Sequence, residues 1–270
     1  MKLATYRFDD GIGPGRVEGD RIVDLRGQAA DMVALLGRDA SVEGPSVPLD
    51  VARLLAPVPD PGAFLGVAIN YRDHAAEVGR ALPDKPVLFA KLRGAVAPPH
   101  GRIVRPAGVD TLDYEGELGV VIGRRCYRPM ADEVMAAVAG YVVVNDVTVR
   151  GRVHPDRVLL AKSAPGHGPF GPWITTADEI ADPEKLAIRT WVNGQLRQDS
   201  STAQLHHGIA ALIAFIADAV ELMPGDVIAT GSPAGSGVGF HPPRFLSPGD
   251  VVRVEIEGLD HIEHIVEEGR

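Results

Sequence analysis

The chain has 270 residues, 45% of them hydrophobic and 23% charged, which is enough for one large domain or for one domain with a smaller appendage. Its formal net charge of -9, with no run of basic residues, argues against a nucleic-acid-binding surface, because phosphates need clustered Lys and Arg. There is a single cysteine, so we expect no disulfide within the chain. The first residues are charged and no apolar run nears the ~20 residues of a membrane span, so we expect neither a secretory signal nor membrane contact. Together these features predict a cytoplasmic protein.

A small β domain is predicted over residues 1–57. Apolar alternation and glycines predict a strand, a turn, a second strand and a short helix. In chain order these segments are Leu3–Phe8, Asp10–Gly15, Arg21–Leu25 and Ala29–Leu36. We expect the two strands to pair as a hairpin. Prolines recur from Pro45 to Pro61, and there we place the boundary with a larger domain, residues 58–270.

Short β-like runs separated by Gly and Pro dominate the rest of the chain. The predicted strands include Val87–Lys91, Leu118–Ile122, Tyr141–Val144, Leu186–Val192, Val227–Thr230 and Val251–Ile256. The predicted helices are few, namely Tyr71–Gly79, Ala131–Val138 and Leu205–Glu221. This balance favours a mainly β fold with short helices over a doubly wound parallel sheet. No glycine-rich nucleotide motif follows a strand, so a nucleotide cofactor is not indicated.

Two glutamates, Glu115 and Glu117, stand at the start of a strand-like run that continues to Ile122. Side chains alternate along a strand, so these carboxylates would share a face, about 6–7 Å apart. Like charges this close oppose folding, and a hard divalent cation relieves the repulsion. The alternative is that both glutamates lie on the solvent-facing side of an edge strand.

A third acid, Asp146, follows the buried-type run Gly140–Asn145. It either forms a turn, which is the commoner role of Asp, or completes a three-carboxylate site. Such a site would leave positions open for water and substrate. Oxygen ligands of this kind suit Mg²⁺, Mn²⁺ or Ca²⁺.

Six stretches, in order along the chain, resemble the motifs of the fumarylacetoacetate hydrolase family. They are Gly66–Glu77, Lys85–Lys91, Asp113–Leu118, Gly140–Val147, Ala161–Ser163 with Gly171–Trp173, and Thr230–Gly235. The resemblance implies a mixed β-roll with a pseudo-barrel core and a small N-terminal β domain, usually in a homodimer. It also implies Mg²⁺ or Mn²⁺ held by Glu115, Glu117 and Asp146. Members of the family cleave, decarboxylate, hydrate or isomerise 2-oxo acids and acylpyruvates, including compounds of aromatic catabolism.

His74 and Glu77 are spaced to share one face of a predicted helix. In the family's hydrolases such a pair lies on a closing lid, which implies that Glu77 holds the imidazole and that His74 activates water. The alternative is an exposed pair that stabilises the helix by a few tenths of a kcal/mol. Lys162 is either a solvated surface charge or, beside the metal, a group that binds the substrate carboxylate or stabilises an enolate.

The resemblance also assigns substrate contacts to Tyr71, Lys91, Thr230 and Gly231. The glycines after Thr230 would let backbone N–H groups approach a carboxylate closely. A plain glycine-rich turn explains the same residues equally well. Lys91 carries the weaker claim of the two lysines.

Three segments depart from the family pattern and leave the substrate open. Gly151–His154 replaces an acidic stretch, Ala164–Gly168 replaces Phe-Asp, and His206–His207 replaces an apolar pocket segment. The histidines of these segments either shape a different pocket or are surface residues, and we expect the latter. They are His154, His167, His206 and His207.

The sequence therefore predicts a metal-dependent hydrolase that cleaves a carbon–carbon bond in an acylpyruvate-like 2,4-dioxo acid. A 2-oxo acid can chelate a cation through its carboxylate and keto oxygens, and the cation then stabilises an enolate. The alternatives are a decarboxylase, hydratase or isomerase of a related 2-oxo acid, or a non-catalytic member that binds a small anion or a partner chain. The expected partner is a small anionic 2-oxo acid, without nucleic acid or membrane.

Overall fold

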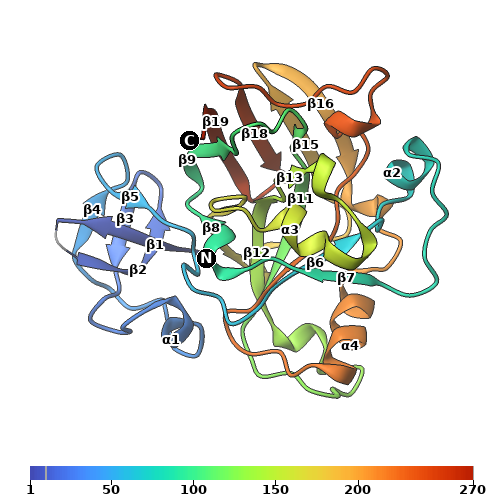
Figure 1. Ribbon diagram of the computed structural model, residues 1–270. Helices are drawn as coiled ribbons and strands as arrows, with labels where there is room; N and C mark the ends of the chain where they lie inside the picture. The colour runs from blue at the N-terminus through green and yellow to red at the C-terminus, as the bar shows by residue number, and fades with distance from the viewer. Residues whose placement is uncertain (10, 270) are drawn as a thin grey trace.

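The computed structural model describes residues 1–9 and 11–269, and most strands belong to one large sheet (Figure 1). Ten of its twelve strands follow the order β4 (Ser46–Pro48), β3 (Arg21–Asp24), β2 (Gly11–Glu18), β1 (Lys2–Phe8), β14 (Gly168–Thr176), β12 (Val138–Asn145), β11 (Gly116–Ile122), β17 (Val227–Ala229), β6 (Phe64–Ala68) and β7 (Val87–Ala90). Off this path, β5 (Arg53–Leu54) pairs with β1, and β8 (Val96–Ala97) pairs with β14.

A second sheet has five strands and a third has two. The five-stranded sheet runs β16 (Gln195–Ser201), β15 (Ala187–Val192), β18 (Val251–Ile256), β19 (Asp260–Glu268) and β9 (His100–Arg105), and the small sheet pairs β10 (Leu112–Asp113) with β13 (Thr148–Val149). The mainly β fold predicted from the sequence is confirmed. Among the described residues, both larger sheets stay open and neither closes into a barrel.

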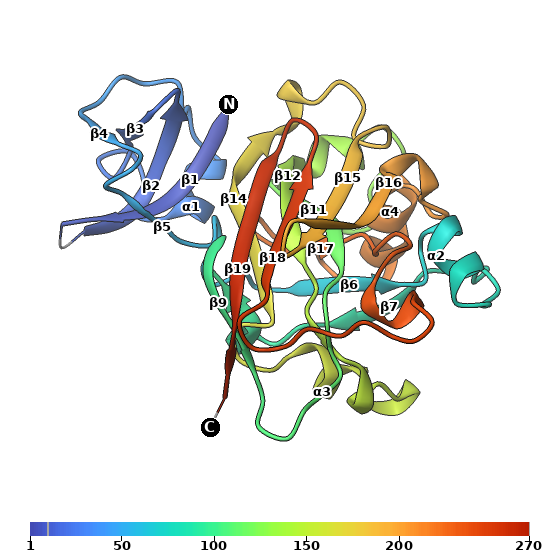
Figure 2. The ribbon, with the colours of Figure 1, turned by 90° about the horizontal axis from the view of Figure 1, so that it is seen from above.

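The helices are few and short (Figures 1 and 2). They are α1 (Met32–Leu36), α2 (Arg72–Glu77), α3 (Val158–Lys162) and α4 (Ile209–Ala219). Single 3₁₀ turns occur at Arg93–Ala95, Met135–Ala137, Arg150–Arg152, Pro155–Arg157, Ala177–Glu179, Thr202–Gln204 and Gly237–Gly239. Within the ranges described, no helix is long and apolar enough to cross a membrane.

The central strands β11 and β12 are covered on both faces. On one face, their side chains pack with Ile188 of β15, Val254 of β18 and residues of α4. On the other face, they pack with Phe64, Phe170 and the residues of α1. Every residue of β11 is consequently buried, which explains why Leu118–Ile122 is a continuous apolar run rather than an alternating one.

The first three strands form a meander, so the hairpin predicted from Leu3–Phe8 and Arg21–Leu25 is wrong. β1 pairs with β2 from Lys2↔Val17 to Phe8↔Gly11, and β2 in turn pairs with β3. The segment expected as a turn is therefore the first half of β2, except for Asp10, which lies outside the described residues. Its glycines serve close packing: a Cβ at Gly15 would meet the Val23 carbonyl oxygen at 2.9 Å.

Tertiary contacts also override two helix predictions. Residues 131–134 form a turn, Met135–Ala137 a single 3₁₀ turn, and β12 starts at Val138, which pairs with Ile122. The Ala137 carbonyl accepts a bond from the Gly123 N–H at 2.7 Å, outside any helix. Further along, α4 begins only at Ile209, because Leu205 forms a β-bridge with Tyr71.

The N-terminal strands continue the large sheet through β1 and β14, which pair at Lys2↔Thr175 and Leu3↔Ile174. Trp173 of β14 packs among Tyr6, Ile22 and other residues of the N-terminal segment. This segment lies to one side of the main body in both ribbon views (Figures 1 and 2). The division at residue 57 stays a prediction, because the sheet runs without a break across it.

Candidate active site

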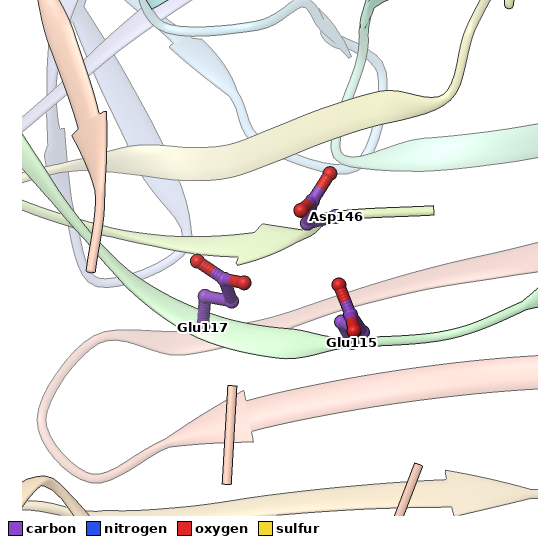
Figure 3. Close-up of side chains that lie close together, drawn as sticks. All are labelled: Glu115, Glu117 and Asp146. Carbon is purple, nitrogen blue, oxygen red and sulfur yellow. The ribbon is translucent and has the colours of Figure 1, made fainter. Parts of the chain in front are cut away.

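Three acidic residues meet where β11 begins and β12 ends (Figure 3). Glu115 directly precedes β11, Glu117 is its second residue, and Asp146 directly follows β12. The antiparallel register pairs Gly116 with Asn145, which brings the two strand ends together. One carboxylate oxygen from each acid lies within 4.8 Å of the others, closer than the strand rise predicts, and all three residues are buried. β11 is an interior strand, so the alternative of a solvent-facing edge strand is wrong.

Three basic side chains contact this carboxylate triad. Lys91 Nζ lies 2.5 Å from Asp146 Oδ1, and Lys162 Nζ lies 2.5 Å from Asp146 Oδ2 and also pairs with Glu115 Oε2. Arg150 Nη2 donates to Glu115 Oε1 at 2.6 Å. Lys91 and Lys162 are buried, so the alternative of a solvated surface charge does not hold for Lys162.

A fourth buried acid, Asp113, extends the cluster. Its carboxylate accepts a bond from Arg150 Nε at 2.7 Å and from the N–H groups of Gly237 and Val238 at 2.7 and 3.1 Å. Burial raises the pKa of Asp113, although Arg150 opposes the shift. Asp113 thus fixes the guanidinium that faces Glu115.

The pKa values of the two glutamates move in opposite directions. Burial would raise the pKa of Glu115, but Arg150 and Lys162 outweigh it and hold that pKa below its usual value. Burial, Asp146 and Glu115 together raise the pKa of Glu117 well above its usual value. The Gly231 N–H donates to Glu117 Oε2 at 2.8 Å. Among the described residues no ion pair compensates Glu117.

The pKa values of Lys91 and Lys162 also move in opposite directions. Burial lowers the pKa of Lys91, with Asp146 opposing the shift. Burial would also lower the pKa of Lys162, but the nearby carboxylates of Asp146 and Glu115 outweigh the effect of burial and raise this pKa. The cluster therefore contains four carboxylates and at most three cations, and a divalent cation bound by oxygen ligands fits this donor set and its excess of negative charge.

His74 and Glu77 form the pair predicted from their spacing. His74 Nδ1 lies 3.1 Å from Glu77 Oε2, and the two side chains are only 11% and 21% exposed. Glu77 Oε1 accepts a bond from the Gly235 N–H at 2.9 Å. The alternative of an exposed helical pair is therefore wrong, because the carboxylate is anchored to a distant loop.

The predicted substrate contacts lie in the same region, and three of the four have hydrogen-bond partners within the protein, whereas the buried Tyr71 hydroxyl has none among the described residues. The Gly231 N–H is bonded to Glu117, and the Thr230 hydroxyl donates to the Leu118 carbonyl at 2.9 Å. Tyr71 is fully buried, and burial followed by Glu117 raises its pKa. Substrate roles for Tyr71, Lys91, Thr230 and Gly231 stay predictions.

The four histidines in the segments that differ from the family pattern are buried to different extents. His154 is exposed, as expected. His167 is fully buried, so its prediction as a surface residue is wrong; it lies between Gly166 and Gly168 at the start of β14, and burial lowers its pKa to about 4. His206 and His207 are half-buried, with Nε2 atoms 3.1 and 3.0 Å from the Pro83 carbonyl.

Sequence reasoning missed several residues that hold the site. Arg150 lies four positions after the predicted ligand Asp146, and a basic residue so near a predicted acidic site is the signal that could have identified it. Asn70 and Asp113 lie within the stretches Gly66–Glu77 and Asp113–Leu118, but the sequence indicates no role for either residue. Gln198 lies in none of these stretches, and its partners at the site, Gly116 and Ser232, are 82 and 34 positions away.

Two family models match the chain. The one described as fumarylacetoacetate (FAA) hydrolase C-terminal matches residues 63–267, and the one described as Rv2993c-like, N-terminal matches residues 1–57. Together they account for both the site and the strands that precede it.

Solved structures of similar proteins share the whole fold, and in each case the match covers 100% of both chains. A fumarylacetoacetate hydrolase from psychrophilic Exiguobacterium antarcticum is 34% identical, with a TM-score of 0.90. A 5-carboxymethyl-2-hydroxymuconate delta-isomerase from Mycobacterium smegmatis is 34% identical, with a TM-score of 0.83. A maleylpyruvate hydrolase from Sphingobium sp. SYK-6, solved in complex with manganese(II) and pyruvate, is 30% identical, with a TM-score of 0.85. The similar proteins thus include both hydrolases and an isomerase.

Proposed function

This chain belongs to the fumarylacetoacetate hydrolase family, and on that premise we propose that it is a divalent-metal-dependent hydrolase that cleaves a carbon–carbon bond in an acylpyruvate-like 2,4-dioxo acid. The observation that carries the proposal is the combination of a buried carboxylate triad with a His–Glu pair anchored to the loop that also binds Glu117. An isomerase needs no water to be activated, whereas a hydrolase needs a base such as His74.

Glu115, Glu117 and Asp146 would hold the metal. When bound, a divalent cation supplies Lewis acidity, which stabilises the negative charge that develops on a carbonyl oxygen. The manganese in the maleylpyruvate hydrolase structure supports Mn²⁺, and Mg²⁺ has the same preference for oxygen ligands.

The charge balance of the site favours an anionic substrate. Four carboxylates face at most three cations, so the protein groups leave an excess of negative charge when all four carboxyls are ionised. A divalent cation would offset the deficit and attract a carboxylate. Lys162, whose buried Nζ lies against Glu115 and Asp146, would bind that carboxylate.

The His74–Glu77 pair supplies the base. With Glu77 accepting the Nδ1 proton, His74 Nε2 carries a lone pair that can take a proton from water. The hydroxide adds to the distal carbonyl carbon, and the bond to the neighbouring carbon breaks. The electron pair passes to the 2-oxo acid fragment, which then takes up a proton, so one substrate and one water give a carboxylic acid and a 2-oxo acid such as pyruvate.

The first test is isothermal titration of Mn²⁺ into EDTA-treated protein. We expect one ion per chain, with binding lost in Glu115→Gln and retained in Glu263→Gln, a matched change at an exposed position of β19. A wild-type protein that binds no Mn²⁺ would contradict the metal-dependent function.

The second test concerns the base. On an acylpyruvate with Mn²⁺ present, His74→Ala should lower kcat by about 100-fold or more. His154→Ala, in an exposed turn, should leave kcat unchanged. Equal turnover in wild type and His74→Ala would exclude this role.

An isomerase of a related 2-oxo acid is the second candidate, favoured by the similarity to 5-carboxymethyl-2-hydroxymuconate delta-isomerase. The two reactions are told apart by their products. A hydrolase releases pyruvate, which lactate dehydrogenase and NADH detect, whereas an isomerase changes the absorbance of its substrate without releasing pyruvate.

Two further expectations accompany this proposal. We propose a homodimer, whose mass by light scattering would be twice the chain mass of 28.6 kDa. A non-catalytic member would bind oxalate, a mimic of a chelating 2-oxo acid, yet turn over none of these substrates.

A further inference from the structure

Two buried amides join the carboxylate triad to the His74–Glu77 pair. We propose that Asn70 and Gln198 are positioning residues that clamp the loop Thr230–Gly235, so that this loop holds Glu117 and Glu77 at a fixed separation. The inference rests on the proposed function for its chemical meaning, but its geometry stands on the contacts of the loop.

The loop grips one carboxylate at each end. The Gly231 N–H donates to Glu117 Oε2 at 2.8 Å, and the Gly235 N–H donates to Glu77 Oε1 at 2.9 Å. Gly231 and Gly235 have φ values of +105 and +94, and a Cβ at Gly235 would overlap the Arg197 carbonyl oxygen. The shape of the loop is therefore fixed, and a shift at one end is transmitted to the other.

Asn70 fixes the first end of the loop to the segment before α2. It is 1% exposed, and its Nδ2 donates to the Thr230 carbonyl at 2.8 Å and to the His207 carbonyl at 3.1 Å. Its Oδ1 accepts a bond from the His207 N–H at 2.9 Å. The preceding Ile69 has a φ of +54, a conformation that costs free energy for a β-branched residue and that the surrounding contacts must maintain.

Gln198 fixes the middle of the loop to the triad. It is fully buried, and its Nε2 donates to Ser232 Oγ at 2.9 Å and to the Pro233 carbonyl at 3.0 Å. Its Oε1 accepts a bond from the N–H of Gly116, at 2.9 Å, the residue between Glu115 and Glu117. Each polar atom of the two amides is thus used, which is how buried groups orient the ligands of a metal site.

Residues of β16 and of the segment after it also form hydrogen bonds with α2. Asp73 Oδ2 accepts a bond from Ser200 Oγ at 2.5 Å, and Arg72 Nη1 donates to the Leu205 carbonyl at 2.5 Å. α2, the loop and the triad therefore form one connected unit. Metal binding at Glu117 should then stabilise α2, although Glu117 and α2 are far apart in the sequence.

The test uses isosteric changes of both amides in the full chain. Asn70→Asp and Gln198→Glu place an oxygen against the carbonyl groups that the amide nitrogen now satisfies. Asn193→Asp is the matched control, because this exposed Asn, in the turn between β15 and β16, bonds Asp250 and Val251 and no residue of the loop. Mn²⁺ affinity is measured by titration, and hydrogen exchange of residues 72–86 and 230–235 is measured with and without Mn²⁺.

We expect the Mn²⁺ Kd to rise by about 10- to 100-fold in both variants and to stay unchanged in Asn193→Asp. In wild type, Mn²⁺ should slow exchange in residues 72–86, and this protection should disappear in the variants. A merely structural role would lower Tm but leave the Kd and the protection unchanged, and that result would overturn the proposal.

Failure of the proposed function gives a different result. If wild type binds no Mn²⁺, the metal-dependent function fails, yet the clamp still predicts that each variant speeds exchange in both segments without metal. Faster exchange in only one segment would overturn the clamp. Should Asn70→Asp fail to fold, Asn70→Ala, which keeps the Cβ that faces Gly231, is measured in its place.

Discussion

Glu115 and Glu117 stand two positions apart on one strand, yet each has a different electrostatic environment. Arg150 and Lys162 compensate Glu115, whereas Glu117 has a single backbone N–H and two other carboxyls around it. The two residues should therefore contribute to folding stability with opposite signs, although the same role in metal binding is proposed for both.

Matched substitutions test this contrast in EDTA-treated protein. Glu115→Gln leaves Arg150 and Lys162 buried without their counter-charge, so the free energy of unfolding should fall by about 3–5 kcal/mol. Glu117→Gln removes a buried charge and keeps an acceptor for the Gly231 N–H, so Tm should rise. Urea and thermal unfolding at neutral pH measure both, and an equal loss of stability in the two variants would contradict the contrast.

The pH dependence of the Glu117 effect follows from the direction of its pKa shift. A carboxyl whose pKa is raised on folding contributes stability that is fully present below its ordinary pKa and is lost as pH rises through the raised pKa. The Tm of Glu117→Gln minus that of wild type should then be near zero in acid and grow as pH rises. A difference that shrinks with rising pH would show that the shift has the opposite sign.

At the scale of single residues, the sequence predicted the carboxylate triad but not Arg150, Gln198 and Asn70, which form hydrogen bonds around it. Glu115, Glu117 and Asp146 form a local pattern at strand ends. The hydrogen-bond partners of Arg150, Gln198 and Asn70 at the site lie 34 to 160 positions away, and no periodicity records such contacts.

The elements that form the site are β11, β12 and the loop Thr230–Gly235. The two strands were predicted because both are continuous apolar runs between turn residues, and their register places the triad. The helix expected over Ala131–Val138 failed because its end pairs as a strand with β11, which local composition does not encode. The hairpin expected from Leu3–Phe8 failed because glycines in β2 looked like a turn.

The loop offers a test of its own with glycine substitutions. Gly235→Ala adds a Cβ that overlaps the Arg197 carbonyl and forces a φ of +94, so we expect a lower Tm and a kcat reduced in parallel with loss of the Glu77 contact. Gly194→Ala is the control, since it also has a positive φ, of +74, but no atom within 4 Å of the added Cβ. Its cost should be about 1 kcal/mol, without an effect on kcat. Similar effects of the two changes would show that the close approach at Gly235 is unimportant.

At the scale of the whole molecule, one Trp connects the N-terminal strands to the main body. Trp173 comes from β14 but packs among Tyr6 and Ile22. The sequence predicted a small domain there and could not show that the same sheet continues into it, because pairing between β1 and β14 joins residues far apart in the chain.

Trp173→Ala should therefore lower the free energy of unfolding by about 3–5 kcal/mol. Trp191→Ala, at a half-buried position on β15, is the control and should have a smaller effect. Urea unfolding followed by circular dichroism measures both. Equal losses would show that the packing around Trp173 contributes no more than that of a partly exposed residue.

The register of β11 against β12 has a consequence for how such a protein diversifies. All three carboxylates come from one pair of neighbouring strands, between residues 115 and 146, whereas the His–Glu pair and the segments that depart from the family pattern come from other parts of the chain. Apart from Lys162, whose Nζ pairs with Glu115 and Asp146, the residues at 151–168 and 205–207 can change without altering the strand pair. A protein built in this way can thus change its substrate while it keeps the same carboxylate triad.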